Sequence, residues 1–442
     1  MKLKVSQNKR YFELDGKPFC WLGDTAWLLF SRLTLEEGKA YLKNRALQGF
    51  TVIQATLVHS KDYHDLDGNR ALNDDDFANP VPLAEGGFWD KALKLVRYAK
   101  ELGLFMGLLP AWGSFVLNGN LNKDNCESYA DFLSEVFGKE ENVIWIVGGD
   151  VMGNKAPDVF RMIGRRLKAD CPENLVGYHP YGRCDSSFWF HTPEDTWLDF
   201  DMFQSGHRDY NQREPWDGNP VFYGEDNYRY VQEDRKLDDP KPTIDGEPSY
   251  ELIPHGLHDG NQPYWQAADV RRYAYWSVFS GAAGHTYGNN AIMQFLKPGY
   301  KPAYAALETW DVALHDVGSG QMRQLKKLFM GFHFEEGEPR QDLIAGENGE
   351  KYLYKAAFLT KNALLVYSYN GDQIKLNTDL LPFEKITYAW FDTVSGAVSF
   401  AGAIEKSSET VFTVPDRRSE VSDRVLIVLN ANKDYDLLKT VM

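Results

Sequence analysis

Two carboxylates in this chain stand directly after short hydrophobic runs, and together they could cleave a glycosidic bond. Asp150 follows the run 145–147 and two glycines, and Glu247 follows the short run that ends at residue 245. Glycoside hydrolysis uses two carboxyl groups on either side of the bond. One protonates the leaving oxygen, and the other attacks C1 or activates water. Asp150 and Glu247 are therefore the candidate catalytic pair.

Neither motif is diagnostic alone. Gly-Gly-Asp is common in turns and at helix N-caps. Gly-Glu-Pro occurs a second time around Glu338, and Glu225 is a rival carboxylate in a loop-like stretch. The prediction therefore depends on the elements that carry Asp150 and Glu247.

Those elements form a repeating pattern of short apolar strands and longer amphipathic helices. Thr34 and Glu37 make a capping-box pattern at the start of one helix, and Gly49 ends it. Apolar strands that alternate with helices indicate a parallel sheet buried on both faces, and eight of them favour a closed barrel. We predict an α/β fold, a (β/α)8 TIM barrel, with strands at 19–23, 51–57, 104–109, 143–147, 175–179, 201–204, 242–245 and 282–285.

The alternation of strands and helices stops after a helix predicted at 322–330. Short strands at 364–369, 386–391, 410–414 and 425–429 follow one another with turns, and no helix pattern, between them. This predicts a small all-β sandwich. We place the barrel at 1–335 and the C-terminal sandwich domain at 336–442.

The barrel prediction also yields a set of candidate site residues. Active sites of such barrels lie at the C-terminal ends of the strands. Asp150 and Glu247 would then face each other across the mouth, from strands four and seven. Side chains predicted to bind substrate hydroxyls or wall the subsite are Asp24, Trp27, Trp112, His179, Gln204, His207, Tyr250, Trp276, His285 and Tyr287.

Composition narrows the class of ligand. A formal charge of −15 without basic runs argues against a nucleic-acid partner. Aromatic residues make up 14 % of the chain, and Tyr and Trp combine an apolar body with a polar tip, which suits sugar rings. A neutral glycoside or oligosaccharide fits this charge. An acidic glycan would require a local patch such as Arg208, Arg213 and Arg229.

A barrel metallohydrolase remains an alternative, because His59, His179, His207 and His285 all fall near predicted strand ends. However, the first strand has no His-x-His, and His-Glu-x-x-His is absent from the sequence. We therefore predict no metal and no cofactor. A non-catalytic glycan-binding protein is the other alternative, although binding alone needs no opposed carboxylates.

Four irregularly spaced cysteines predict free buried thiols. The first residues contain no apolar run of signal-peptide type, and no later run could span a membrane. This predicts a cytoplasmic protein without membrane association, although a trimmed secreted chain would look the same. The oligomeric state is left open.

Five motifs together resemble the apiosidase-like glycoside hydrolase family. They are Trp21-Leu22-Gly23-Asp24-Thr25-Ala26-Trp27, Gly148-Gly149-Asp150, Gln204-Ser205-Gly206-His207, Gly246-Glu247-Pro248-Ser249-Tyr250-Glu251 and Gly281-Ala282-Ala283-Gly284-His285-Thr286-Tyr287-Gly288.

The resemblance implies a barrel followed by a β-sandwich, a part sometimes described as collagen-binding. It also implies a retaining mechanism with Asp150 as acid/base and Glu247 as nucleophile. Its implied substrates are plant cell-wall oligosaccharides, such as apiose-containing side chains of the pectin rhamnogalacturonan II. The implied process is pectin degradation.

Overall fold

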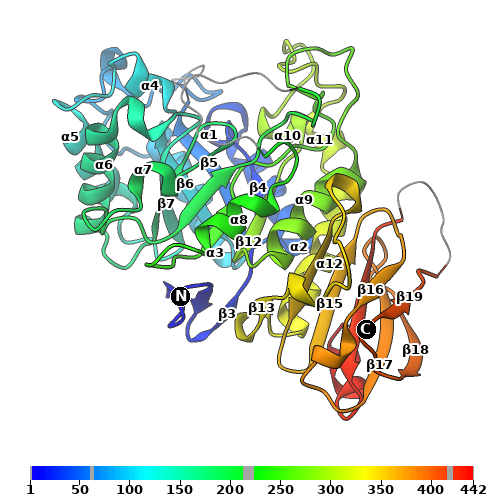
Figure 1. Ribbon diagram of the computed structural model, residues 1–442. Helices are drawn as coiled ribbons and strands as arrows, with labels where there is room; N and C mark the ends of the chain where they lie inside the picture. Colours follow the sequence, from blue (N-terminus) through cyan, green and yellow to red (C-terminus); the bar gives the residue numbers. More distant parts are fainter. Residues whose placement is uncertain (1, 60–63, 213–222, 416–421, 442) are drawn as a thin grey trace.

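The computed structural model describes residues 2–59, 64–212, 223–415 and 422–441, and it shows a barrel with a separate sheet domain beside it (Figure 1). Arg213, one of the three arginines of the predicted basic patch, lies outside the described residues.

Eight parallel strands form the barrel wall, and each lies within two residues of its predicted bounds. Their hydrogen-bonded order is β8-β7-β6-β5-β4-β12-β11-β10. The TIM-barrel prediction is confirmed. The strands are β4 (Trp21–Thr25), β5 (Val52–Val58), β6 (Phe105–Ala111), β7 (Val143–Gly148), β8 (Val176–His179), β10 (Asp201–Gln204), β11 (Thr243–Asp245) and β12 (Gly284–Tyr287).

The barrel closes between β8 and β10 by a different set of contacts. The Asp199 N–H donates to the Val176 carbonyl, and the Asp199 carboxylate accepts from the Val176 N–H, each at 2.8 Å. The Phe200 ring occupies the space that a side chain on Gly177 would need. A short strand, β9 (Cys184–Asp185), runs antiparallel to β10. Two residues are too few for a periodic signal, and the sequence did not predict this strand.

Helices cover the outside of the barrel and join its strands. In α2 the predicted capping box of Thr34 and Glu37 is present, and Gly49 ends the helix with a φ of 94°. The described helices are α1 (Leu29–Arg32), α2 (Leu35–Gln48), α3 (Phe88–Glu101), α4 (Ser114–Leu117), α5 (Cys126–Phe137), α6 (Pro157–Asp170), α7 (Ser187–Phe190), α8 (Tyr228–Asp234), α9 (Ala267–Phe279), α10 (Asn290–Met293), α11 (Trp310–Ala313), α12 (Val317–Gly331) and α13 (Asp434–Val441).

A three-stranded antiparallel sheet at the N-terminus lies against one end of the barrel (Figure 1, dark blue). It comprises β1 (Leu3–Val5), β2 (Phe12–Leu14) and β3 (Lys17–Phe19). Phe12 packs edge-on against Phe200, and Phe19 packs edge-on against Phe105 at the start of β6. Because these contacts lie at the N-terminal ends of the barrel strands, the sheet leaves the opposite mouth open.

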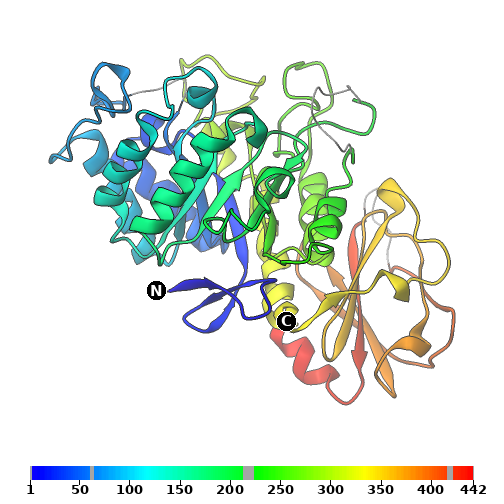
Figure 2. The same ribbon diagram turned by 60° about the vertical axis from the view of Figure 1, so that its left-hand side comes forward.

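The sheets of the C-terminal domain are antiparallel throughout, which confirms the predicted β-sheet domain but not its all-β character, because the domain ends in α13. A six-stranded sheet has the order β13-β14-β15-β20-β17-β18, and β16 pairs with β19 in a smaller sheet. The strands are β13 (Glu338–Pro339), β14 (Lys355–Leu359), β15 (Ala363–Ser368), β16 (Ile374–Leu376), β17 (Ile386–Asp392), β18 (Val398–Ile404), β19 (Thr410–Phe412) and β20 (Arg424–Asn430). Helix α13 was not predicted from the sequence. It lies against α12 (Figure 2), and its Thr440 hydroxyl donates to the Gly331 carbonyl at the end of α12.

Helix α9 packs against the C-terminal sheet. Tyr275 stacks on Tyr367, with ring centroids 4.8 Å apart. Arg271 forms a buried ion pair with Asp423, at 2.6 Å between Nη2 and Oδ1. A buried charge pair is geometrically demanding, because neither partner can fall back on water. The two domains are thus joined by a buried, oriented contact.

The four cysteines are buried free thiols, as predicted. Within the described ranges, none of the helices combines the length and the apolar character needed to span a bilayer.

Candidate active site

A cavity of about 390 Å³ opens at the C-terminal ends of the barrel strands, and both candidate carboxylates line it. Asp150 follows β7 and Glu247 follows β11, so the two come from opposite parts of the wall. Asp150 and Glu247 therefore share one cavity. Because the chain closes into a barrel, residues 97 positions apart (247 minus 150) share one site.

The turn that presents Asp150 is conformationally unusual. Gly148, Gly149 and Asp150 have φ values of 95°, 106° and 55°. A side chain at Gly148 would lie 2.5 Å from the His179 carbonyl oxygen, so glycine is required there. Positive φ is uncommon for residues other than glycine, although Asp adopts it more readily than most. The turn holds the Asp150 carboxyl at the cavity wall instead of letting β7 continue.

Two histidines hold the Glu247 carboxylate. His207 Nε2 lies 3.0 Å from Oε1, and His179 Nε2 lies 3.2 Å from Oε2. Burial alone would raise the pKa of Glu247, but the contacts with His179 and His207 outweigh it and lower the pKa to about 2. Glu247 is therefore an ionised carboxylate in a buried site.

The pKa of Asp150 is shifted in the opposite direction. Burial raises its pKa well above the usual range, and the negative charge of Glu247 raises it further. The Gln204 side chain and the Gly182 N–H act against this rise without cancelling it. The surroundings of the two carboxyl groups thus raise the pKa of Asp150 and lower that of Glu247.

His179 links the two carboxylates. The Asp150 backbone N–H donates to its Nδ1 at 3.3 Å. A ring nitrogen that accepts carries no proton, so the ring hydrogen is on Nε2, which faces Glu247. The His179 imidazole therefore contacts both the Asp150 turn and the Glu247 carboxylate.

Aromatic side chains form one wall of the cavity. Trp27 and Trp112 pack edge to face with centroids 5.3 Å apart, and the Trp27 indole N–H donates to the Tyr250 hydroxyl at 3.1 Å. Burial, and then the charge of Glu247, raise the pKa of Tyr250 well above its usual value. Tyr250 stays protonated beside the carboxylate. Among the predicted substrate-binding residues, those in the cavity lining are Trp27, Trp112, Gln204, His207 and Tyr250. His179 stands behind them, against Glu247.

Asp24, His285 and Tyr287 were predicted to contact substrate, and the structure corrects all three. Side chains alternate along a strand, and these three point outward from the barrel wall. Asp24 and Tyr287 are paired in register between β4 and β12. Asp24 accepts from Tyr41 and Arg45 of α2, and the Tyr287 hydroxyl donates to Glu251, all at 2.5 Å.

His285 faces α9, where its Nδ1 lies 3.3 Å from the Ser277 hydroxyl. Burial lowers the pKa of His285 to about 3, so the ring is neutral. Trp276 is the fourth correction. It lies on α9 outside the barrel, edge-on to Tyr228 and Tyr354, at the contact with the sheet domain.

The corrected role of Asp24 can be tested by stability. Asp24 and Arg45 are both fully buried, so removing the cation leaves an uncompensated charge. We expect Arg45→Met to lower the free energy of unfolding by about 3–5 kcal/mol. The matched control is Lys39→Met on the same helix, whose partner Glu36 is exposed, and it should change stability by less than about 0.5 kcal/mol. Chemical denaturation of both variants measures the difference; equal effects would contradict the assignment.

Several basic and aromatic lining residues were not predicted. They are Arg32, Arg183, Lys301 and Tyr304, and they join Arg208, which the sequence placed in a basic patch. Arg32 follows β4 at the end of α1, whereas Lys301 and Tyr304 lie in the loop after β12. Their positions in the segments that follow barrel strands could have indicated that they line the cavity. Arg229 of the same predicted patch pairs with Asp226 instead.

The histidines do not assemble into a ligand set. His179 and His207 both engage Glu247, and His285 faces α9. In the part of the chain that the structure describes, no group of three or more His, Cys, Asp or Glu side chains is placed to hold a metal ion.

Comparison with known families identifies the barrel. Residues 6–336 match the model described as "Apiosidase-like, catalytic domain". The chain belongs to the apiosidase-like family. Residues 339–429 match a second model, described as "Putative collagen-binding domain of a collagenase".

Two solved structures match the chain over both domains. One, titled "Glycoside hydrolase", is 40% identical over 98% of each chain, with a TM-score of 0.93. Another, a glycoside hydrolase family 5 protein from Bacteroides vulgatus ATCC 8482, is 37% identical, also with a TM-score of 0.93. That match covers 98% of this chain and 95% of the other. Curated proteins contain no match. The prediction that this apiosidase-like chain is a glycoside hydrolase is confirmed.

Proposed function

We propose that this apiosidase-like chain is a retaining glycoside hydrolase in which Glu247 is the nucleophile and Asp150 is the acid/base. The proposal rests on two carboxyl groups that line one cavity and whose surroundings shift their pKa values in opposite directions. The pKa of Glu247 is lowered to about 2, whereas that of Asp150 is raised well above its usual range. Two carboxyl groups whose surroundings push their pKa values apart are the signature of an acid and a base in one site.

In the first half of the proposed reaction, the Glu247 carboxylate attacks C1 of the sugar. The bond from C1 to the leaving oxygen breaks, and Asp150 gives that oxygen its proton. His179 and His207 hold Glu247 so that one oxygen can reach C1. The product of this half is a glycosyl ester on Glu247, and Asp150 is now a carboxylate.

In the second half, Asp150 takes a proton from water as the water oxygen attacks C1. The ester bond breaks and returns the electron pair to Glu247, which releases the sugar with its original anomeric configuration. Once Glu247 is esterified, its negative charge no longer raises the pKa of Asp150. Asp150 can then act as a base at the pH where it had acted as an acid.

Gln204 is suited to orient the sugar. Its side chain faces Asp150, and its Oε1 is buried without a hydrogen-bond partner among the described atoms. A buried acceptor without a partner is costly, and a substrate hydroxyl would satisfy it. Trp27 and Trp112 would pack against the apolar faces of the ring.

The proposed substrate is an acidic plant cell-wall oligosaccharide, with apiose of a pectin side chain as the first sugar to test. The family description supports apiose. The lining supports an acidic glycan, because it contains the cationic side chains of Arg32, Arg183, Arg208 and Lys301. This group of cations contrasts with the formal charge of −15 for the whole chain. In this proposal, residues 1–335 are the catalytic domain and 336–442 the sheet domain.

The experiment is a panel of aryl glycosides, comprising apioside, arabinofuranoside and galactofuranoside, followed by proton NMR of the cleaved one. We expect the first detectable product to have the same anomeric configuration as the substrate. The other anomer should appear later, by mutarotation. An inverted first product would contradict the retaining mechanism, and carboxyl groups more than about 6.5 Å apart would do the same.

A further inference from the structure

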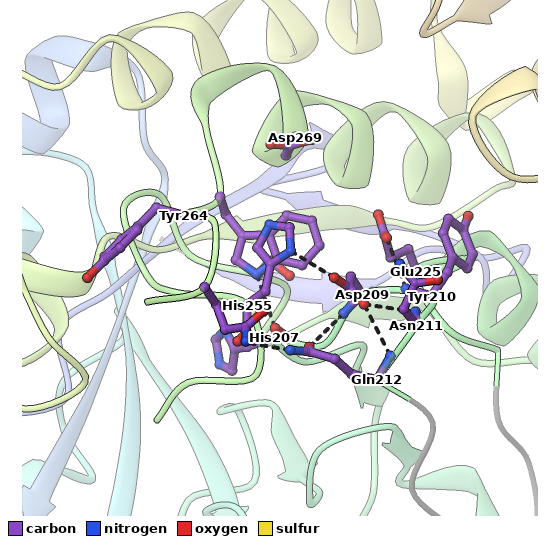
Figure 3. Close-up of polar contacts among 12 residues, drawn as sticks. His207, Asp209, Tyr210, Asn211, Gln212, Glu225, His255, Tyr264 and Asp269 are labelled. Carbon is purple, nitrogen blue, oxygen red and sulfur yellow. Dashed lines mark hydrogen bonds and ion pairs between the residues drawn. The ribbon is translucent and has the colours of Figure 1, made fainter. Parts of the chain in front are cut away.

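The segment 205–212, which carries His207, is held on one side by the loop after β11. The His207 carbonyl accepts from the Gly256 N–H at 2.8 Å and from the Trp265 indole N–H at 3.1 Å. His255 stacks on Trp265 with centroids 3.8 Å apart, and its Nδ1 lies 3.0 Å from Asp209 Oδ2 (Figure 3). These contacts fix the backbone at His207 and just after it.

The other side of the same segment is held by Glu225. The Tyr210 N–H donates to Glu225 Oε1 at 3.2 Å, and Figure 3 shows Glu225 beside Tyr210, on the side of the segment away from His255. Glu225 is completely buried, and Arg272 donates to its Oε2. The Tyr352 hydroxyl also donates to Oε1, at 2.9 Å, and the Tyr352 ring packs edge-on against Tyr210.

Tyr352 belongs to the C-terminal region, within the 3-10 helix Lys351–Leu353. Together with Tyr369 of that region, it encloses the buried Arg272, since both ring centroids lie 4.8 Å from the guanidinium carbon. The Tyr369 hydroxyl and Arg272 both donate to Asp269 Oδ1, at 2.9 Å and 3.2 Å. Each charge in this group is therefore matched by a partner that the sheet domain helps to place.

We propose that the sheet domain is a positioning element of the active site: through Tyr352 and Glu225 it fixes the segment 205–212, and so holds His207 against Glu247. The proposal rests on the proposed role of Glu247. It gives the C-terminal domain a function inside this enzyme, separate from any binding of an external polymer. Tyr352, Glu225 and Arg272 are positioning residues, because they act through His207 and do not line the cavity.

The test compares Tyr352→Phe, Glu225→Gln and the control Tyr388→Phe. Tyr352 is 38% exposed, so losing its hydroxyl should leave the fold intact. Tyr388 lies in the same domain but packs on Phe412, away from the barrel. Hydrogen exchange of the peptide covering 205–212 needs no substrate. The second readout is kcat, KM and the acid limb of the kcat/KM profile on the aryl glycoside cleaved in the panel.

We expect Tyr352→Phe and Glu225→Gln to speed exchange in 205–212. We also expect kcat to fall about tenfold or more, because small displacements of a catalytic group are costly. KM should stay within about twofold, the pattern of a lost transition-state contact. The acid limb should move to higher pH, because a displaced His207 lowers the pKa of Glu247 less. Tyr388→Phe should match the wild type.

Unchanged exchange in both variants would overturn the proposal. Faster exchange with an unchanged kcat and acid limb would also overturn it, because the segment would then move without affecting catalysis. If the wild type cleaves no glycoside in the panel, the proposed function fails while the exchange comparison still reports whether Tyr352 holds the segment.

Discussion

Replacing Glu247 by Gln is expected to lower kcat by about 10⁴-fold or more, because the amide cannot form the glycosyl ester and triad-type catalytic groups show losses of this order. The change keeps the size of the side chain and its contacts with His179 and His207, so the fold should survive. Single-turnover hydrolysis of the aryl glycoside measures the loss, and circular dichroism checks the fold.

The chain provides a matched control for this substitution. Glu338 stands in a second Gly-Glu-Pro tripeptide, in β13 of the C-terminal sheet, and its side chain is exposed. Glu338→Gln should retain wild-type activity. If both variants keep near wild-type turnover, Glu247 is not the nucleophile.

Replacing Asp150 by Asn is expected to lower kcat by about 10²–10⁴-fold on a substrate with a poor leaving group, the usual contribution of a general acid. The rate of the first half-reaction should fall much less for a dinitrophenyl leaving group, because that group departs without protonation. The measurement is kcat/KM for a series of aryl leaving groups. A uniform loss across the series would contradict a role in leaving-group protonation.

The pH profile should follow from the same two groups. Glu247 must be ionised, and its pKa of about 2 places the acid limb of the wild-type profile at low pH. Asp150 must be protonated, and burial together with the Glu247 charge raises its pKa well above the usual range. Activity should therefore persist below the Asp150 pKa and decline as the pH rises through it. In Asp150→Asn this alkaline limb should disappear.

The barrel was predictable from the chain because its strands are buried on both faces. A strand such as Val143–Gly148 reads as a continuous apolar run, and the helix that follows it has a clear amphipathic period. The closure at Asp199 and Phe200 left no such signal, because it uses one carboxylate and one ring packed on Gly177.

The location of the site could be predicted from the sequence better than the residues that line it. Strand ends located Asp150 and Glu247, but a strand-end rule does not say which face a side chain takes. The predictions for Asp24, His285 and Tyr287 were wrong for that reason, since these side chains point to α2, α9 and Glu251 respectively. The prediction for Trp276 was wrong because this helix residue faces the adjoining domain.

The pairing of His179 and His207 on Glu247 is a long-range feature. His179 ends β8 and His207 lies three residues after the end of β10, and nothing in the local sequence of either indicates a shared partner. The same holds for Tyr352, which reaches Glu225 from another domain, 127 positions along the chain.

The most direct test of the account is to trap the intermediate. The enzyme would be incubated with a 2-deoxy-2-fluoro glycoside of the cleaved sugar bearing a dinitrophenyl leaving group, and then digested for mass spectrometry. The account predicts one fluoroglycosyl group per chain, in the peptide that contains Glu247, and a fall in activity that matches the labelling. A label on another carboxylate, or turnover of the reagent with no label at any time, would contradict it.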